Sequence, residues 1–376
     1  MNAKQITIIL GTRPEGIKLA PLIKMMQNSC DFNVRVCVTG QHRQMLDQVL
    51  NTFGIVPECN FNIMTENQDL SSLTCKLVDK ITCDLKDHRP DMVIVQGDTT
   101  TVMAGGLASF YMRVPISHVE AGLRSNDIYS PFPEEANRRI VSLFAKLNFA
   151  PTVAAKNNLL KEGVATDKIY VTGNTGIDTL FLAIQKIKKE KIAIDSLPIE
   201  NNRKMVLITA HRRESFGEGF RNICKAIRFL CDKFPQMDFV YPVHLNPNVQ
   251  QPVNEFLRHE QPSNLYLIAP QDYIPFVSLL NRAYLILTDS GGVQEEAPSL
   301  GKPVLVMRDN TERPEAVNAG TARLVGNSFD GIVCHVSELL ENSNIYCSMA
   351  NATNPYGDGQ ACQRICNIIR DYFSLL

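Results

Sequence analysis

Short runs of apolar residues alternate with longer amphipathic segments along the chain. Turn residues and then a helix-like stretch follow each run, an order typical of parallel strands joined by covering helices. The predicted strands are residues 6–10, 33–39, 92–96, 116–119, 147–150 and 169–171, then 205–209, 239–242, 265–268, 284–287 and 304–307. Because parallel strands buried on both faces are apolar throughout, these runs predict an α/β fold with two parallel sheets.

The strand pattern restarts in the second half, and 376 residues suit two domains. We expect a first Rossmann-like domain over residues 1–172 and a second over residues 173–359. Residues 360–376, most of which have helical periodicity, are expected to join the first domain. The Lys-rich stretch 184–204 is predicted to be a helix followed by a surface connection inside the second domain.

Composition and charge exclude several classes of protein. The net charge is −1, so no basic field favours nucleic acid or an anionic membrane. The apolar run 6–10 is too short for a signal peptide, and no stretch approaches the roughly 20 apolar residues of a membrane span. The eleven cysteines are scattered without paired CxxC motifs, which favours reduced thiols in the cytoplasm and no zinc knuckle.

A phosphate-binding loop is predicted at residues 288–296, which follow a strand and open a helix. Gly291 and Gly292 let the backbone approach a ligand, and the helix start offers free N–H donors. The Ser290 hydroxyl adds a donor, and Glu296 is positioned to accept from a ribose diol. A plain turn is the alternative interpretation, because Ser-Gly-Gly alone is a weak signal.

Residues 11–18 repeat this arrangement after the first strand, with Arg13 and Lys18 as candidate phosphate ligands. The segment is neither a complete GxGxxG fingerprint nor a Walker loop, which disfavours classical NAD binding and P-loop chemistry. An Arg-Pro-Glu helix start recurs at residues 313–315. Lys18 could equally be a solvated helix charge, and Arg-Pro-Glu is also simply a good helix start.

Three carboxylates are expected at one sheet edge. Asp98 and Glu120 follow the third and fourth predicted strands, and Glu134 opens a helix after a loop containing two prolines. Ligands of open α/β sheets bind at the carboxyl ends of strands, and crowded carboxylates acquire different pKa values, so one acts as acid and another as base. Helix capping by Asp98 and a helix-dipole role for Glu134 are the alternatives.

His211 follows the first strand of the second domain, where it is expected to contact a pyrophosphate or to move protons. A turn histidine is the alternative. No Gly-x-Ser-x-Gly or His-Glu-x-x-His motif is present, which leaves covalent nucleophilic catalysis and metal sites with little support.

Taken together, the motifs resemble the bacterial non-hydrolysing UDP-N-acetylglucosamine 2-epimerases along essentially the whole chain. Those that carry the resemblance are residues 11–15 (GTRPE), 97–101 (GDTTT), 118–124 (HVEAGLR), 133–138 (PEEANR), 211–214 (HRRE), 289–296 (DSGGVQEE), 313–316 (RPEA) and 354–359 (NPYGDG). Departures are mild: Gly16 stands where alanine is common, Gln96 where histidine is frequent, and Phe132 where tryptophan is frequent.

The resemblance implies two Rossmann-like domains in a GT-B-like arrangement, an active site in the cleft between them, a homodimer, and no cofactor or metal. The catalytic positions that it implies are Asp98, Glu120, Glu134 and His211. The implied nucleotide-sugar contacts are Arg13, Lys18, Gln271, Phe276, Ser290, Gly291, Gly292, Glu296 and Arg313. A second, activating UDP-N-acetylglucosamine would bind at Gln41, His42, Gln44, Arg212 and His244.

The resemblance also implies a chemistry: elimination of UDP to 2-acetamidoglucal, followed by re-addition that yields UDP-N-acetylmannosamine. A hydrolysing epimerase, which releases N-acetylmannosamine and UDP, shares the first step. A GT-B glycosyltransferase is a further alternative, although it would need an acceptor groove. A non-catalytic nucleotide-sugar regulator is another, although it would not need the carboxylates.

Overall fold

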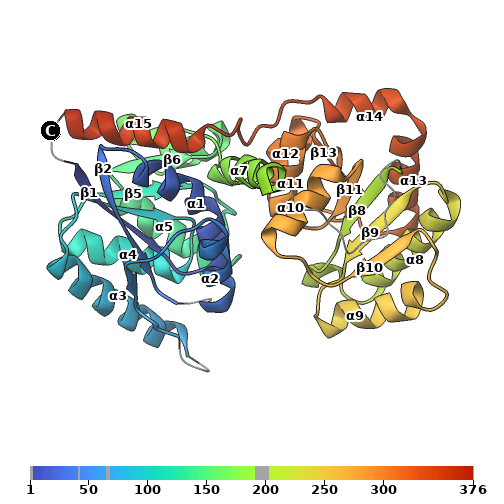
Figure 1. Cartoon of the computed structure of the whole chain (residues 1–376), viewed down its shortest axis with the longest axis horizontal. Coiled ribbons are helices and arrows are strands. Elements are labelled where there is room, and N and C mark those ends of the chain that lie inside the picture. Colours follow the sequence, from blue (N-terminus) through green and yellow to red (C-terminus); the bar gives the residue numbers. More distant parts are fainter. Residues whose placement is uncertain (1–2, 41–42, 65–67, 191–202, 376) are drawn as a thin grey trace. The chain divides into compact units, whose positions relative to one another are not determined.

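Two parallel sheets organise the chain, each in a unit of its own (Figure 1). The computed structural model describes residues 3–40, 43–64, 68–190 and 203–375, with the side chains of residues 43 and 44 outside that description. Unit 1 comprises Met1–Thr179 and Tyr356–Leu376, and unit 2 comprises Leu180–Pro355. The predicted α/β class with two parallel sheets is confirmed.

Unit 1 holds a 7-stranded parallel sheet in the order β3-β2-β1-β4-β5-β6-β7. Its strands are β1 (Lys4–Leu10), β2 (Phe32–Val38), β3 (Cys59–Asn60), β4 (Met92–Gln96), β5 (Ile116–Val119), β6 (Leu147–Ala150) and β7 (Ile169–Val171). Strands β1 and β4 are neighbours in the sheet, yet their crossovers lead in opposite directions, so this pair is the topological switch point.

The helices of unit 1 pack in two groups. They are α1 (Arg13–Gln27), α2 (Arg43–Thr52), α3 (Leu70–Asp87), α4 (Thr100–Tyr111), α5 (Glu134–Phe144), α6 (Val153–Lys161), the first part of α7 (Thr175–Glu190), and α15 (Ala361–Ser374). Helices α3, α4 and α5 cover the face of the sheet where Ile9, Val93 and Val95 are buried. Helix α1 contacts α2 and α15.

The C-terminal helix α15 is fastened to unit 1 by a buried carboxylate. Asp178 accepts from the backbone N–H groups of Ala361 (3.2 Å) and Cys362 (2.9 Å), the first two residues of α15. A carboxylate suits that position because the N–H groups of a first helical turn have no partner inside the helix. Gly173 (φ +90°) and Gly357 (φ +131°) pass so closely that a Cβ on either would lie 3.4 Å from the other's Cα.

Unit 2 holds a 6-stranded parallel sheet in the order β10-β9-β8-β11-β12-β13. The strands are β8 (Met205–Thr209), β9 (Asp238–Pro242), β10 (Leu265–Ile268), β11 (Leu285–Thr288), β12 (Val304–Val306) and β13 (Ala322–Leu324). Strand β8 pairs with both β9 and β11, so the switch point of this sheet lies between β8 and β11.

One large core cluster joins this sheet to several of the helices of unit 2. It buries Phe239 and Tyr241 of β9 together with Phe220, Ile227 and Val336, which lie on two helices. The helices are the remainder of α7, then α8 (Glu218–Lys233), α9 (Pro247–Val253), α10 (Tyr273–Arg282), α11 (Gly291–Glu296), α12 (Pro314–Asn318), α13 (Phe329–Glu341) and α14 (Ser343–Ala350).

Several expectations differ in detail from the structure. Strands β3 and β13, only two and three residues long, were not foreseen, and β11 begins at Leu285 rather than one residue earlier. The predicted domain boundary near residue 173 stays a prediction, because α7 runs continuously from unit 1 into unit 2. Residues 191–202 of the predicted surface connection lie outside the described residues. No helix in the described part of the chain is long and apolar enough to cross a membrane.

Candidate active-site elements

The loops that leave β1 and β4 meet at the switch point of unit 1, and a buried glutamate joins them. The Oε2 atom of Glu15 accepts from the backbone N–H groups of Gly11 (2.5 Å) and Thr12 (3.0 Å). The Thr99 hydroxyl, which belongs to the β4–α4 loop, donates to Oε1 of the same carboxylate. Glu15 therefore holds the loop that precedes Lys18 against the loop that carries Asp98.

Burial gives Glu15 a pH-dependent effect on stability. Desolvation raises the pKa of Glu15 to about 7, although its three hydrogen bonds favour the charged form. Because the folded pKa exceeds the unfolded value, the stability that this proton contributes is fully present below about pH 4.5 and is lost as the pH rises through about 7.

We expect Glu15→Gln to lessen this loss of stability between pH 5 and pH 8. Glutamine keeps an acceptor for Gly11 and Thr12, and its NH₂ group can donate to the Thr99 hydroxyl. The difference in unfolding free energy between variant and parent should shift by up to about 3 kcal/mol across this pH range. Urea unfolding at several pH values measures it, and a pH-independent difference would contradict the assignment.

Asp98 follows β4 and is fixed by the start of α5. Its carboxylate forms an ion pair with Arg138, and its backbone carbonyl accepts from Asn137 Nδ2 at 2.9 Å. One residue earlier, the carbonyl of Gly97 lies 2.7 Å from His118 Nε2. Burial lowers the pKa of His118 to about 4, so the ring is neutral at pH 7 and donates this hydrogen bond. Asp98 remains partly exposed, with 29% of its side chain open to solvent.

Glu120 follows β5, the strand next to β4, in a sparsely populated backbone conformation. Its φ is +65°, in the left-handed region that costs a residue with a Cβ about 1–2 kcal/mol. Lys18 Nζ lies 2.6 Å from Oε1 and 2.7 Å from Oε2, and Gln96 Nε2 donates to Oε2. The charged form of Glu120 thus has three donor contacts, of which Gln96 makes one.

Two adjacent glutamates at the start of α5 have different surroundings. Glu135 is fully buried, contacts Arg138 and Arg139, and accepts from the backbone N–H of Ser125 at 3.0 Å. Glu134 is half-buried, and its Oε2 atom is shielded from solvent without a hydrogen-bond partner among the described residues. Both glutamates lie in the first turn of α5, so the helix-dipole role stays open as the alternative for Glu134.

In unit 2, Asp289 holds a neighbouring loop through backbone hydrogen bonds, as Glu15 does in unit 1. This fully buried aspartate follows β11, and its Oδ2 accepts from the consecutive N–H groups of His211 (2.6 Å) and Arg212 (2.7 Å) in the loop after β8. Its Oδ1 lies 3.4 Å from His211 Nδ1. Burial lowers the pKa of His211 despite the nearby carboxylate, so the neutral ring is favoured.

Two arginines surround the start of α11, where a phosphate ligand is predicted. A Cβ placed on Gly291 would lie 3.8 Å from a guanidinium nitrogen of Arg212 and 3.9 Å from one of Arg313. Gly292 is exposed, with open space where a Cβ would stand. The Ser290 N–H donates to Thr288 Oγ1 at 2.9 Å, and Arg313 is held by Glu295. The structure therefore brings Ser290, Gly291 and Arg313 together with the His211 loop.

The other predicted contacts are less tightly grouped. Gln271 donates to the carbonyl of Ala269 at 2.8 Å, and Phe276, in the first turns of α10, is half-buried, as are Glu296 and Arg13. Among the predicted activator residues, His244 stacks its ring on that of His211 at a centroid distance of 5.4 Å. Gln41, His42 and the side chain of Gln44 lie outside the described residues.

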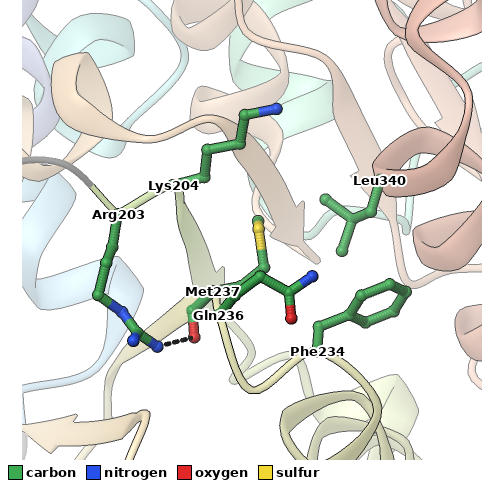
Figure 2. Close-up of a pocket in the computed structure, with 6 residues that line it drawn as sticks. All are labelled: Arg203, Lys204, Phe234, Gln236, Met237 and Leu340. Carbon is green, nitrogen blue, oxygen red and sulfur yellow. Dashed lines mark hydrogen bonds between the residues drawn. The ribbon is translucent and has the colours of Figure 1, made fainter.

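A pocket of about 350 Å³ lies elsewhere in unit 2 (Figure 2). Arg203 and Lys204, which precede β8, line it with residues that precede β9 and with Leu340 of α13. These positions are at the amino ends of the strands, whereas ligands of open α/β sheets bind at the carboxyl ends. The pocket contains none of the predicted site residues.

Two sets of residues in the described structure were not foreseen as functional groups. Glu15 and Asp289 stood inside recognised motifs, but burial and long-range contacts, rather than local sequence, reveal that they clamp loops. Cys37, Cys59 and Asp84 also come together in unit 1, with donor atoms within 4.8 Å of one another. Cysteine spacing cannot signal this group, because strand pairing across separate elements creates it.

Comparison with known proteins points to a single family. A family model described as UDP-N-acetylglucosamine 2-epimerase matches residues 24–370. The UDP-N-acetylglucosamine 2-epimerases of Campylobacter jejuni and Escherichia coli K12 are each 52% identical to this chain, with 97–98% of both chains covered. A crystal structure of the Neisseria meningitidis UDP-GlcNAc 2-epimerase bound to UDP-GlcNAc has a TM-score of 0.89 at 48% identity, covering 98% of this chain and 100% of that one. The Methanocaldococcus jannaschii enzyme in complex with UDP-GlcNAc and UDP has a TM-score of 0.77 at 35% identity, covering 97% and 99%.

Proposed function

Because the chain belongs to the UDP-N-acetylglucosamine 2-epimerase family, we propose that it reversibly converts UDP-N-acetylglucosamine to UDP-N-acetylmannosamine without hydrolysis. The carboxylates of unit 1 act on the sugar, and the loops of unit 2 hold the UDP. The observation that carries the proposal is the pair of Asp98 and Glu120, which follow neighbouring strands at one sheet edge and are each held by a cation.

The proposed chemistry is an elimination followed by an addition. A carboxylate removes the C2 proton while the bond from C1 to the β-phosphate oxygen breaks, which forms a C1–C2 double bond and leaves 2-acetamidoglucal and UDP. The same phosphate oxygen then attacks C1 while a second acid delivers a proton to the other face of C2. An acid–base pair suits this route, because the C2 proton has no neighbouring carbonyl to acidify it and the chain lacks a nicotinamide-binding fingerprint.

Further contacts support the division of roles. Glu134 has a solvent-shielded carboxylate oxygen that no described residue hydrogen-bonds, at the helix that fixes Asp98, so we assign it an assisting role. Arg13 and Lys18 after β1, and Arg313 beside Gly291, supply positive charge for the leaving diphosphate. His211 contacts the diphosphate as a neutral donor, and Gln271, Phe276, Ser290, Gly292 and Glu296 bind the nucleoside end.

The proposed mechanism predicts that solvent deuterium enters the product. When UDP-N-acetylglucosamine is incubated with the protein in D₂O, the C2–H signals of both epimers should disappear from the proton NMR spectrum as the two forms equilibrate. The reason is that the proton removed from one face is replaced on the other by an acid that exchanges with solvent.

The same NMR experiment separates the alternatives. UDP-N-acetylmannosamine that retains its C2 proton would contradict the elimination. Accumulation of free N-acetylmannosamine with UDP, in place of the UDP-linked epimer, would identify the hydrolysing reaction. Heat-denatured protein is the control, because neither epimer should form or exchange in its presence.

We also propose that the chain forms a homodimer through the surface of α4 and α5. Phe110 and Phe144 stack their rings at 4.8 Å there, Tyr111 is exposed, and Leu143 has 79% of its surface open to solvent. Contiguous exposed apolar side chains are typical of protein–protein interfaces.

Light scattering should give twice the chain mass of 42.0 kDa. Leu143→Arg should shift this value towards the monomer, because it places a charge in the apolar patch. The control is Val56→Arg, at a position that is similarly exposed, at 78%, but lies on a separate loop. A monomeric parent protein, or a dimer that is unaffected by Leu143→Arg, would contradict this interface.

A second UDP-N-acetylglucosamine acting as an activator remains a proposal. The stacking of His244 on His211, and the position of Arg212 beside Gly291, support it by linking two of the predicted activator residues to predicted substrate contacts. Gln41, His42 and Gln44 complete the proposed set. A sigmoidal dependence of the initial rate on substrate concentration is the expected sign of such a site.

A further inference from the structure

Unit 1 contains a group of soft ligands that the proposed reaction does not use. Cys37 of β2, Cys59 of β3 and Asp84 of α3 each offer one donor atom, and these atoms lie within 4.8 Å of one another. We propose that this group binds one divalent, thiolate-preferring metal ion such as Zn²⁺, with a structural role. The proposal does not depend on the proposed function.

Strand pairing and helix packing create the ligand set. Cys37 and Cys59 are register partners in the parallel pair β2–β3, so their side chains lie on the same face of the sheet. Both cysteines adjoin the core cluster formed with α3, and the carboxylate of Asp84 approaches them from that helix. Three elements that are distant in sequence thus contribute one ligand each.

The distances suit a tetrahedral ion. Zinc–sulfur and zinc–oxygen bonds of about 2.3 and 2.0 Å at a tetrahedral angle place the two ligand atoms about 3.5 Å apart. The observed distance from Cys37 Sγ to Asp84 Oδ2 is 3.6 Å. The ligands therefore need only small side-chain movements to surround an ion.

Charge balance explains how an arginine can lie beside a cation site. Arg35 contacts Asp84 Oδ1 at 2.5 Å, which leaves Oδ2 directed towards Cys37. Two neutral thiols and one carboxylate carry a charge of −1. A Zn²⁺ ion bound by two thiolates and the same carboxylate also carries −1, with two protons released to solvent. The ion pair with Arg35 is therefore retained, and Arg35 orients the carboxylate from behind.

We expect His88 or water to supply the fourth ligand. His88 Nδ1 lies 3.5 Å from Asp84 Oδ1, and 54% of the His88 side chain is exposed, so the ring can turn towards the ion; otherwise water completes the tetrahedron. Because metal binding releases the two thiol protons, binding becomes stronger as the pH rises. The expected benefit is to fasten β3, an edge strand of only two residues, to the sheet and to α3.

Titration of chelator-treated, reduced protein with Co²⁺ tests the site. We expect one equivalent to produce the near-ultraviolet absorption of cobalt–thiolate bonds, and one equivalent of Zn²⁺ to abolish it. One fewer thiol, that of the half-buried Cys59, should react with a disulfide reagent when Zn²⁺ is bound, because Cys37 is buried with or without the ion. A full titration without this absorption, or with no change in the number of reactive thiols, would overturn the proposal.

Variants assign the ligands. Cys59→Ser, at a half-buried position, and Asp84→Asn should each weaken Co²⁺ binding at least tenfold. Cys83→Ser, at the exposed residue next to Asp84, is the matched control and should bind as the parent does. Thiolate absorption that is equally strong in Cys59→Ser would show that other cysteines bind the ion, and would also overturn the proposal. Circular dichroism verifies that each variant is folded.

Discussion

Replacing Asp98 with asparagine should lower the turnover number about 10³-fold, the range expected when a general acid or base is lost. Asparagine has nearly the same shape and can still accept a hydrogen bond from Arg138, and the contact of Asn137 with the backbone carbonyl is unaffected. It cannot take or give the C2 proton. The expected result is therefore a loss of turnover with little change in UDP affinity, measured by NMR assay and by calorimetry.

A matched control separates chemistry from stability. Asp91 is an exposed aspartate at the opposite end of the same strand, where its carboxylate accepts from the backbone N–H of Gln5 at 2.8 Å. Asp91→Asn should keep near-parental activity. Parental turnover in Asp98→Asn would remove Asp98 from the acid–base pair, and an equal loss in both variants would indicate a general structural effect.

The sequence predicts the sheets well, because the strands of a covered parallel sheet are continuous apolar runs. Strands β4, β5, β6 and β7 begin and end at the predicted residues. Strand β3 has only two residues, and its existence depends on pairing with Cys37 and Val38 rather than on a local pattern. The same reason explains the failure to foresee β13, which has three residues and pairs with β12.

Topology explains why candidate site residues could be predicted within each unit. Asp98 and Glu120 follow adjacent parallel strands, so their proximity to one sheet edge requires only the correct strand order. Local sequence does not distinguish Glu134 from Glu135, because both occupy the first turn of α5. Only the packing of α5 decides that Glu135 is buried in ion pairs while Glu134 keeps an oxygen without a partner in the described part of the chain.

Long-range polar contacts were the least predictable feature. Glu15 appeared to be an ordinary first-turn glutamate, yet Thr99, 84 positions along the chain, donates to its carboxylate. Asp289 likewise accepts from two N–H groups nearly 80 residues earlier. Each unit therefore has a buried carboxylate that orders a neighbouring loop. In unit 1 the carboxylate lies in the helix that follows a strand of the switch point, and in unit 2 it directly follows such a strand.

The second large effect is expected at Glu120, where catalytic function and backbone strain coincide. Glu120→Gln should lower turnover about 10²- to 10³-fold, because the amide cannot exchange the C2 proton and removes the negative charge of the ion pair with Lys18. The control is Glu162→Gln, which removes a carboxylate from the ion pair with Arg124 at 2.7 Å and should leave turnover nearly unchanged.

Glu120→Gly distinguishes a strained catalytic residue from a structural one. Glycine adopts φ near +65° without strain, so the relief of about 1 kcal/mol should offset much of the lost ion pair with Lys18. Turnover should nevertheless fall as far as in Glu120→Gln, while the unfolding free energy, measured in urea, changes by less than about 1 kcal/mol. A variant that retains turnover would exclude Glu120 from proton transfer. A variant that loses several kcal/mol of stability would instead identify its carboxylate as a structural anchor, because strain is tolerated at a position only when the group held there contributes more than the strain costs.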